Sequence, residues 1–275
     1  MKLLAGKTVL AHHLERMQKV QGLSAVYLAT AQTPDNEALV EEALRYGAKA
    51  YMGAQEDILE RHIAIAEQEA ADAVIRVTCD SPVFDIDLAS AFCLSYKGED
   101  YLYANNMTMT QGTTSEVISV AALRRSHEHY RGPAITQYIK EHLGDFRTKG
   151  FPMRERVCRP EIRLTLDYPD DLQLFELIFD ALYEGRPFDL ADVYTFLDDN
   201  PHLININKNV AMKSVETYGD MLLSIPEFRV VRYGPRTVIY DKRGRVVEYS
   251  QFLDALATLF QADSPASHSG DEMKR

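Results

Sequence analysis

Two aspartates that follow strand-like segments are the residues best suited to chemistry. Asp80 closes the run "VIRVTCD" (74–80), and Asp167 closes "IRLTLD" (162–167). In a parallel α/β sheet, ligands bind outside the carboxyl ends of the strands. Two carboxylates from different strand ends can hold one Mg²⁺, which fills its remaining positions with water and substrate phosphates. Such an ion would neutralise a triphosphate and stabilise the charge on departing pyrophosphate.

Structural alternatives exist for each of these residues. Asp167 precedes "YPDD" and could be a helix N-cap, and Asp80 could cap the turn before Pro82. The pairs His12-His13 and His127-x-His129 fit an ordinary solvated helix face better than a metal site, because zinc needs convergent ligands.

Composition limits the class of protein. The chain has 275 residues, 46% of them hydrophobic, and a net charge of −11, which argues against nucleic acid or an anionic membrane as a partner. Cys79, Cys93 and Cys158 are an odd number without C-x-x-C spacing, as in a reduced protein. No apolar run approaches the ~18 residues of a membrane span. We expect a cytoplasmic protein without membrane insertion.

The elements that must position the aspartates alternate along the chain. We predict strands at 25–30, 48–53, 73–79, 100–105 and 162–167. Helices are predicted at 8–20, 36–46 (ended by Gly47), 56–71, 86–96, 120–130, 134–143, 169–184 and 189–198. Strands that alternate with helices are typical of a mostly parallel sheet covered by helices on both faces, in three layers.

The C-terminal part differs in character. We expect a domain over 1–210, a hairpin–helix appendage over 211–262 and a disordered tail over 263–275. The hairpin spans 228–249 around a turn at "DKRG" (241–244), and a helix follows at 250–261. Six Lys and Arg residues oppose two acidic ones in 228–249, which suits either a partner's acidic surface or a soluble sheet edge. The appendage should pack on the main domain or mediate a homodimer.

Several motifs, in the right order, carry a family resemblance over roughly residues 3–210. They are Ala29-Thr30, Gly53, "DILER" (57–61), "RVTCDSP" (76–82), "QGTTSEVIS" (111–119) and "IRLTLDYPDDLQL" (162–174). The chain resembles the cytidylyltransferases of spore-coat polysaccharide biosynthesis, relatives of the enzymes that make CMP-activated acidic sugars. This resemblance implies a glycosyltransferase A-like, Rossmann-related nucleotidyltransferase fold.

The resemblance also implies roles for individual residues. Asp80 and Asp167 would be the Mg²⁺ ligands, while Arg76 and Thr78 would shape the nucleotide side or be structural strand residues. Arg61 would reach substrate or pair with Asp57 on its own helix. The residues implied on the acceptor-sugar side, besides Arg61, are Gly112, Glu116 and either Asn105 or Asn106.

One part of the family pattern is absent. The family's sheet has a first strand between the strands matched here by 25–30 and 74–79, followed by a loop that wraps the nucleotide. The chain begins at Met1 just beyond that loop. Because buried backbone groups are almost always paired, either the flanking strands pair directly or the natural protein is longer. We expect the second.

The predicted function is transfer of CMP from CTP to a sugar, with release of pyrophosphate. No protein nucleophile is required, since positioning and charge neutralisation supply the rate. The alternative is a non-catalytic relative that binds a nucleotide or sugar, or an assembly subunit.

Overall fold

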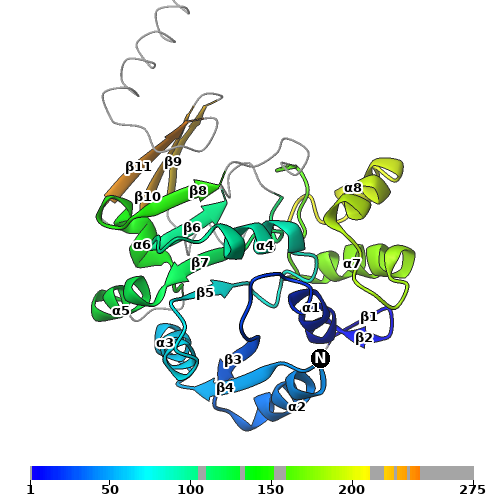
Figure 1. Ribbon diagram of the computed structural model, residues 1–275. Coiled ribbons are helices and arrows are strands. Elements are labelled where there is room, and N and C mark those ends of the chain that lie inside the picture. Colours follow the sequence, from blue (N-terminus) through cyan, green and yellow to red (C-terminus); the bar gives the residue numbers. More distant parts are fainter. Residues whose placement is uncertain are drawn as a thin grey trace, which may run out of the picture.

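Short strands alternate with helices over the first hundred residues, as predicted (Figure 1). The structure, a computed structural model, describes residues 2–104, 110–130, 134–151, 159–210, 220–225, 228–233 and 236–241. The first elements are β1 (Leu3–Leu4), β2 (Lys7–Thr8), α1 (Val9–Met17), β3 (Tyr27–Ala31), η1 (Pro34–Asn36), α2 (Glu37–Arg45), β4 (Lys49–Gly53), α3 (Ile58–Gln68), β5 (Ala73–Arg76) and α4 (Ile86–Ser95).

The alternation loosens after α4, again as predicted. The elements that follow are β6 (Tyr101–Ala104), β7 (Glu116–Ser119), α5 (Val120–His129), α6 (Gln137–Glu141), η2 (Leu143–Asp145), β8 (Thr148–Phe151), α7 (Pro169–Leu182), α8 (Leu190–Asp199), η4 (Leu203–Asn205), β9 (Asp220–Ile225), β10 (Phe228–Tyr233) and β11 (Arg236–Asp241).

Side-chain caps explain where several helices begin. Thr8, Asp57, Asp85 and Ser119 each accept a hydrogen bond from the backbone N–H three residues further on. Such a cap satisfies a donor that the helix itself leaves unpaired, and it contributes about 1 kcal/mol. Gly47 follows α2 with φ +74°, the left-handed conformation in which glycine ends a helix.

The sheet departs from the prediction in two respects. β3 pairs with β4 in parallel, while β5, β7, β6 and β8 form a separate sheet in that order. β7 runs antiparallel to both β5 and β6, while β6 pairs with β8 in parallel, so β5, β6 and β8 share one direction and β7 alone opposes them. The connection 105–115 between β6 and β7 is too short for the helical crossover that joins parallel strands. A short connection brings the chain back in the opposite direction.

We expected a strand at 162–167, but the segment forms none, because its backbone hydrogen-bonds first to one neighbouring segment and then to another. Arg163 forms a single bridge to Gln111, and the Leu164 N–H donates to the Gln111 carbonyl at 2.8 Å. The Leu166 N–H then donates to the carbonyl of Asp80 at 2.7 Å. An extended segment shared between two neighbours forms no continuous ladder with either.

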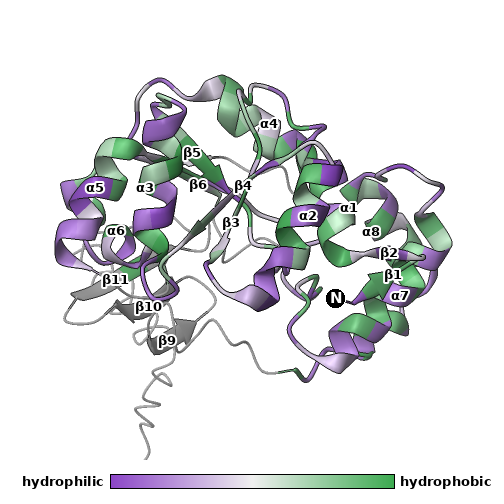
Figure 2. Cartoon of the chain, turned by 90° about the horizontal axis from the view of Figure 1, so that it is seen from below, coloured by the Kyte–Doolittle hydropathy of each residue, from purple (hydrophilic) through white to green (hydrophobic). Residues whose placement is uncertain are grey.

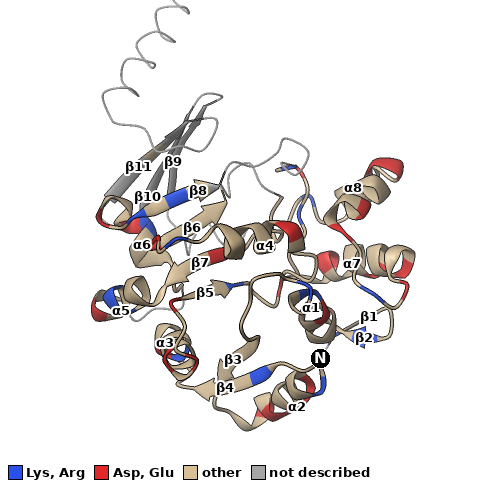
Figure 3. Cartoon of the chain, viewed as in Figure 1, with Lys and Arg blue, Asp and Glu red and all other residues tan. Residues whose placement is uncertain are grey.

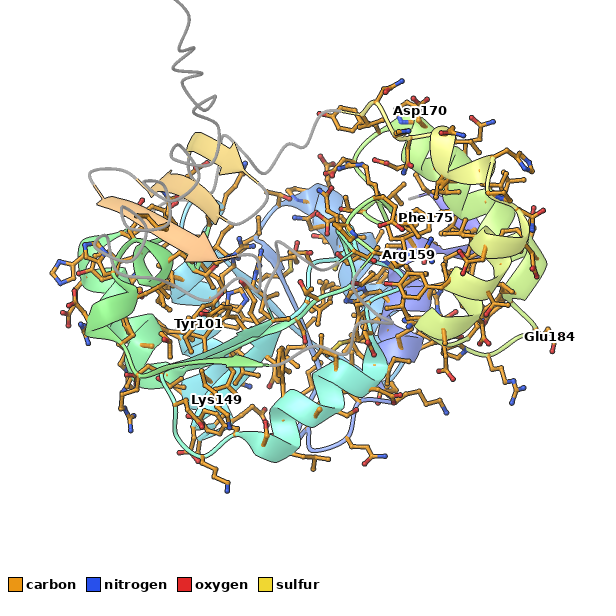
Figure 4. The ribbon with its side chains drawn as sticks, turned by 90° about the horizontal axis from the view of Figure 1, so that it is seen from above. Tyr101, Lys149, Arg159, Asp170, Phe175 and Glu184 are labelled. Atoms are coloured by element: carbon orange, nitrogen blue, oxygen red, sulfur yellow. The ribbon has the colours of Figure 1, made fainter. Side chains whose placement is uncertain are left out.

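Helices cover both faces of the strands, in the predicted three layers. Figure 2 shows α3 and α5 on one side of β3–β6, and α1, α2 and α4 on the other. Tyr101 of β6 and Phe175 of α7 are fully buried in different hydrophobic clusters, which Figure 4 shows on opposite sides of the molecule. Acidic residues are prominent on α7 and α8, which fits the negative net charge (Figure 3). Among the described residues, no helix has the length and apolar character that crossing a membrane requires.

The C-terminal part contains a sheet in which β10 lies between β9 and β11, and both pairings are antiparallel. Tyr233 pairs with Arg236, so β10 and β11 are the two arms of a hairpin, whereas we expected the hairpin turn at 241–244. β10 contacts α6 of the main domain, and the appendage as a unit stays a prediction. Residues 242–275, with the expected helix at 250–261 and the tail, lie outside the described residues, so the domain boundaries stay a prediction.

Candidate functional site

The segment 162–167 brings the two candidate metal ligands together. The hydrogen bond from Leu166 to Asp80 joins the residue before Asp167 directly to Asp80, although the two aspartates are far apart in sequence. Both residues are half-buried. The backbone therefore joins the two segments that carry the aspartates, and their binding of one ion stays a prediction.

The turn that carries Asp80 is held by its own hydroxyl groups. The Ser81 N–H donates to the Thr78 carbonyl at 3.0 Å, and the hydroxyl oxygens of Thr78 and Ser81 lie 3.2 Å apart. The Ser81 hydroxyl also donates to Asp80 Oδ1 at 3.1 Å. Ser81 is buried, so this network of hydrogen bonds holds the turn and the Asp80 carboxylate in place.

A buried arginine fixes Asp167. Arg163 Nη2 donates to Asp167 Oδ2 at 2.8 Å and to Asp171 Oδ2 at 3.0 Å, while its Nε donates to Asp171 Oδ1 at 2.8 Å. The side chain of Asp171 is fully buried. Burial raises the pKa of Asp171, but its hydrogen bonds, first that from Arg163, outweigh burial and hold the pKa below its ordinary value.

The N-cap alternative for Asp167 is wrong. The N-cap of α7 is Tyr168, and Asp171 accepts hydrogen bonds from the backbone N–H groups of Asp167 and Tyr168, both at 3.0 Å. Asn207 donates to Asp171 Oδ1 at 2.8 Å as well. The capping box at the start of α7 is therefore formed by Tyr168 and Asp171.

Arg76 and Glu116 form part of a buried charged cluster. The two residues are paired across β5 and β7, with 3.4 Å between Arg76 Nη1 and Glu116 Oε2. Lys140 Nζ lies 2.8 Å from Glu116 Oε1, and the Tyr101 hydroxyl donates to the same oxygen at 2.6 Å. Burial alone would raise the pKa of Glu116, but Lys140 and Arg76 lower it to about 2. Glu116 is therefore ionised, and its partners fix its position.

Gly112 lies at the crossing of two backbones. It has φ +84°, and a Cβ there would be 1.9 Å from the Leu164 carbonyl oxygen. Only glycine allows the loop before β7 to approach the segment that leads to Asp167. This close packing explains why glycine is needed at position 112. A contact between Gly112 and the sugar stays a prediction.

Replacing Gly112 with alanine should loosen the site. We expect Gly112→Ala to lower the free energy of unfolding by at least about 2 kcal/mol more than Gly98→Ala. Gly98 is a matched control because it has φ +90° and nothing within 4 Å of its added Cβ. Chemical denaturation measures both variants, and equal losses would show that the crossing tolerates a methyl group.

Arg61 does not pair with Asp57. The Asp57 carboxylate caps α3 and contacts His127 Nε2 at 2.7 Å. Arg61 is 7% exposed, and its Nε has no hydrogen-bond partner in the described part of the chain. Burial lowers the pKa of Arg61. The side chain lines a cavity of about 450 Å³, together with Arg76 and Thr78.

The histidines are structural in a way that the sequence did not indicate. His12 and His13 are buried, at 2% and 4% exposed, so the expectation of a solvated face is wrong for them. His12 Nε2 bonds the Leu4 carbonyl at 2.7 Å. His127 joins α5 to α3 through Asp57, and His129 stacks on Tyr138 with 5.0 Å between ring centroids.

The donor set suits magnesium better than zinc. Across the described residues, no three His, Cys, Asp or Glu side chains come together as metal ligands. Mg²⁺ is commonly held by one or two carboxylates plus substrate phosphates, whereas a zinc site needs three or four protein ligands. Two aspartates on hydrogen-bonded backbone segments would therefore suit Mg²⁺ better than zinc, and their role as ligands stays a prediction.

Several residues of the site were not recognised from the sequence. Arg163 and Asp171 belong to the quoted motif "IRLTLDYPDDLQL", so their eight-residue spacing could have suggested a buried pair. Tyr101 and Lys140 carry no such signal, because they come from distant elements. Asn105 and Asn106 lie outside the described residues, as does Cys158.

Comparisons with known proteins are consistent with this geometry. No family model matches the chain. The uncharacterized protein MJ1063 of Methanocaldococcus jannaschii is 28% identical over 215 residues, 77% of this chain and 88% of the relative. The spore coat polysaccharide biosynthesis protein SpsF of Bacillus subtilis is 24% identical over 182 residues, 63% of this chain and 75% of SpsF.

A solved structure shares the fold. A cytidylyltransferase from Leptospira borgpetersenii superposes with a TM-score of 0.67 at 20% sequence identity, covering 76% of this chain and 90% of the other. The α/β nucleotidyltransferase fold is therefore confirmed. The chain is therefore similar in sequence to SpsF, at the level of a remote relative, and similar in fold to a cytidylyltransferase.

Proposed function

We propose that the protein transfers CMP from CTP to a sugar, with release of pyrophosphate. The sugar is an acidic one used in cell-surface polysaccharide or glycan synthesis. The observation that carries the proposal is the hydrogen bond from the Leu166 N–H to the Asp80 carbonyl, which joins the backbone segments of Asp80 and Asp167. Sequence similarity to SpsF and the fold shared with a cytidylyltransferase support the same reaction.

In this mechanism Asp80 and Asp167 would hold Mg²⁺, which when bound would offset charge on the phosphates of CTP. Arg163 orients the Asp167 carboxylate through the 2.8 Å hydrogen bond to Oδ2. Ser81 orients Asp80, and Thr78 lies next to this turn on the nucleotide side. Fixed charges of this kind lower the barrier because they need no reorganisation during the reaction.

The sugar side is assigned to the elements around β7. The cluster of Glu116, Arg76 and Lys140 is rigid, since each of its charges has an ionic partner. Gly112 allows the loop before β7 to approach the Asp167 segment closely. A hydroxyl group of the sugar would attack the α-phosphate, and no side chain of the protein acts as a nucleophile.

A pyrophosphate-release assay tests this proposal. The full chain should release pyrophosphate from CTP in the presence of Mg²⁺ and an acidic sugar, and chelation with EDTA should abolish the release. ATP, GTP and UTP serve as competing substrates. Release from none of the four nucleotides with any acidic sugar would contradict the catalytic proposal.

The second candidate is a relative that binds a nucleotide or sugar without turnover, or that serves as an assembly subunit. The observation that favours it is the lack of pairing between β3 and β5, which leaves the sheet divided beside the site. Calorimetric binding of CTP with Mg²⁺ but without pyrophosphate release would support this candidate over the enzyme.

A further inference from the structure

The Asp167 carboxylate belongs to a closed ring of hydrogen bonds. The backbone N–H of Asp167 donates to Asp171 Oδ2 at 3.0 Å. Arg163 Nη2 donates to the same oxygen of Asp171 at 3.0 Å and to Asp167 Oδ2 at 2.8 Å. Asp171 therefore holds Asp167 at its backbone and, through the guanidinium group of Arg163, at its carboxylate. A carboxylate held in both ways is oriented before any ligand arrives.

Asn207 anchors this ring from the segment that follows η4. Its Nδ2 donates to Asp171 Oδ1 at 2.8 Å and to the Arg163 carbonyl at 3.1 Å. Asn207 and Asp171 are 1% and 0% exposed, so water does not compete for these hydrogen bonds. Because one amide group contacts both residues, Asn207 fixes the Asp171 carboxylate relative to the backbone of Arg163.

Two carboxylates share one guanidinium group in the ring. Arg163 donates from Nε and Nη2 to the two oxygens of Asp171, and from Nη2 to Asp167. Its Nη1 donates to the neutral side chain of Gln111 at 3.0 Å. A contact that engages both oxygens of a carboxylate is the stronger kind of arginine pair. The positive charge of Arg163 is therefore offset chiefly by Asp171, although Arg163 also orients Asp167.

This sharing matters for the binding of a cation. If Asp167 alone balanced Arg163, their charges would cancel, and a metal ion would have to compete with the arginine for the carboxylate. With Asp171 as the main counter-charge, Asp167 is oriented and keeps its negative charge for the ion. Groups that hold a metal-binding side chain in this way typically change metal affinity by about 10- to 100-fold when they are replaced.

We propose that Asp171 and Asn207 are positioning residues for Asp167. Asp171 holds Arg163 and balances its charge, and Asn207 holds Asp171, so that Arg163 orients the Asp167 carboxylate without neutralising it. The proposal rests on the proposed function, in which Asp167 would be a ligand of Mg²⁺. Asp171 and Asn207 would act through Arg163 and Asp167 rather than by contact with the ion.

Binding of Mn²⁺, followed by electron paramagnetic resonance, tests the proposal without turnover. Mn²⁺ takes the same oxygen ligands as Mg²⁺. In the full chain, Asp171→Asn should weaken Mn²⁺ binding at least tenfold, because Arg163 then has Asp167 as its anionic partner. Asp171→Asn that binds Mn²⁺ as tightly as the unsubstituted chain would overturn the proposal and leave the proposed function standing.

A second substitution separates charge balance from a purely structural role. Adding Arg163→Gln to Asp171→Asn removes the guanidinium group that would cancel the charge of Asp167. Binding of Mn²⁺ should then recover at least threefold relative to Asp171→Asn alone. If the two residues only supported the fold, the second buried change would weaken binding further. A double variant that binds no better than Asp171→Asn would overturn the proposal.

Asn207→Ala tests the outer part of the ring with a milder change. It removes one donor to Asp171 and should weaken Mn²⁺ binding at least threefold. Asn200→Ala is the matched control, because its amide donates to the Phe196 carbonyl at 2.9 Å, and binding should not change. Circular dichroism verifies that the variants fold. Should Asp171→Asn unfold, equal binding by Asn207→Ala and Asn200→Ala would overturn the proposal.

Failure of the proposed function gives a different result. Asp167→Asn removes the expected ligand itself and should weaken Mn²⁺ binding at least as much as Asp171→Asn. If Asp167→Asn and the unsubstituted chain bind Mn²⁺ equally, or neither binds it, Asp167 is not a metal ligand. That outcome would overturn the metal site of the proposed function together with the roles of Asp171 and Asn207.

Discussion

Replacing Asp80 with asparagine should lower Mg²⁺-dependent pyrophosphate release from CTP by about 10²- to 10³-fold. The side chain keeps its size and can still accept a hydrogen bond from Ser81, which donates to Asp80 Oδ1 at 3.1 Å. It loses the negative charge that would hold the metal ion. Asp167→Asn should lower pyrophosphate release by a similar factor, since both carboxylates would bind one ion.

The matched control for this prediction is Asp87→Asn. Asp87 is exposed in the first turn of α4, seven positions after Asp80, so its substitution removes the same charge from a nearby surface. Steady-state kinetics over a range of Mg²⁺ concentrations measures all three variants. If Asp80→Asn and Asp87→Asn were equally active at every Mg²⁺ concentration, Asp80 would not be a metal ligand.

Replacing Glu116 with glutamine should lower the free energy of unfolding at pH 7 by about 3 kcal/mol. Glu116 is 6% exposed and offsets the charges of Arg76 and Lys140, so the substitution removes a buried negative charge that two cations contact. A fall in the pKa of Glu116 from 4.5 to about 2 corresponds to a similar free energy. Urea denaturation measures the loss.

The lowered pKa of Glu116 also predicts that the stability of the fold depends on pH. Because folding lowers the pKa of Glu116, its contribution is fully present above about pH 4.5 and is lost as the pH falls toward 2. The difference in stability between Glu116→Gln and the unsubstituted protein should therefore shrink over that interval. A difference that stays constant from pH 5 to pH 2.5 would contradict the assignment.

The control for Glu116 is Glu67→Gln, on the exposed face of α3. Glu67 also pairs with an arginine, at 2.7 Å from Arg124 Nη2, but both side chains are at least half exposed. Exposed ion pairs contribute about 0–1 kcal/mol because water screens them. A loss at Glu67 as large as that at Glu116 would mean that burial does not determine the effect.

The sequence by itself determined the order of elements and the position of Asp80. Helix ends followed from local chemistry, as at Asp57 and Gly47, where the side chain or the backbone conformation acts within a few residues. The motifs around Asp80 and Asp167 were also readable, because each is contiguous in the chain. Local periodicity and contiguous motifs need no knowledge of distant partners.

Pairings between distant segments were decided by the tertiary structure. The sequence did not show that β7 would lie antiparallel between β5 and β6, or that 162–167 would divide its hydrogen bonds between Gln111 and Asp80. A strand's own pattern of side chains specifies which face is buried but not which neighbour it meets.

The partners of buried charges were likewise decided in three dimensions. Glu116 could be quoted from its motif, but Tyr101 and Lys140 reach it from β6 and α6. His12 and His13 looked like a solvated pair and are buried, because residues of other elements close over α1. Burial depends on the packing of elements that are distant in sequence, so only the folded chain determines which charges lose water and which partners compensate them.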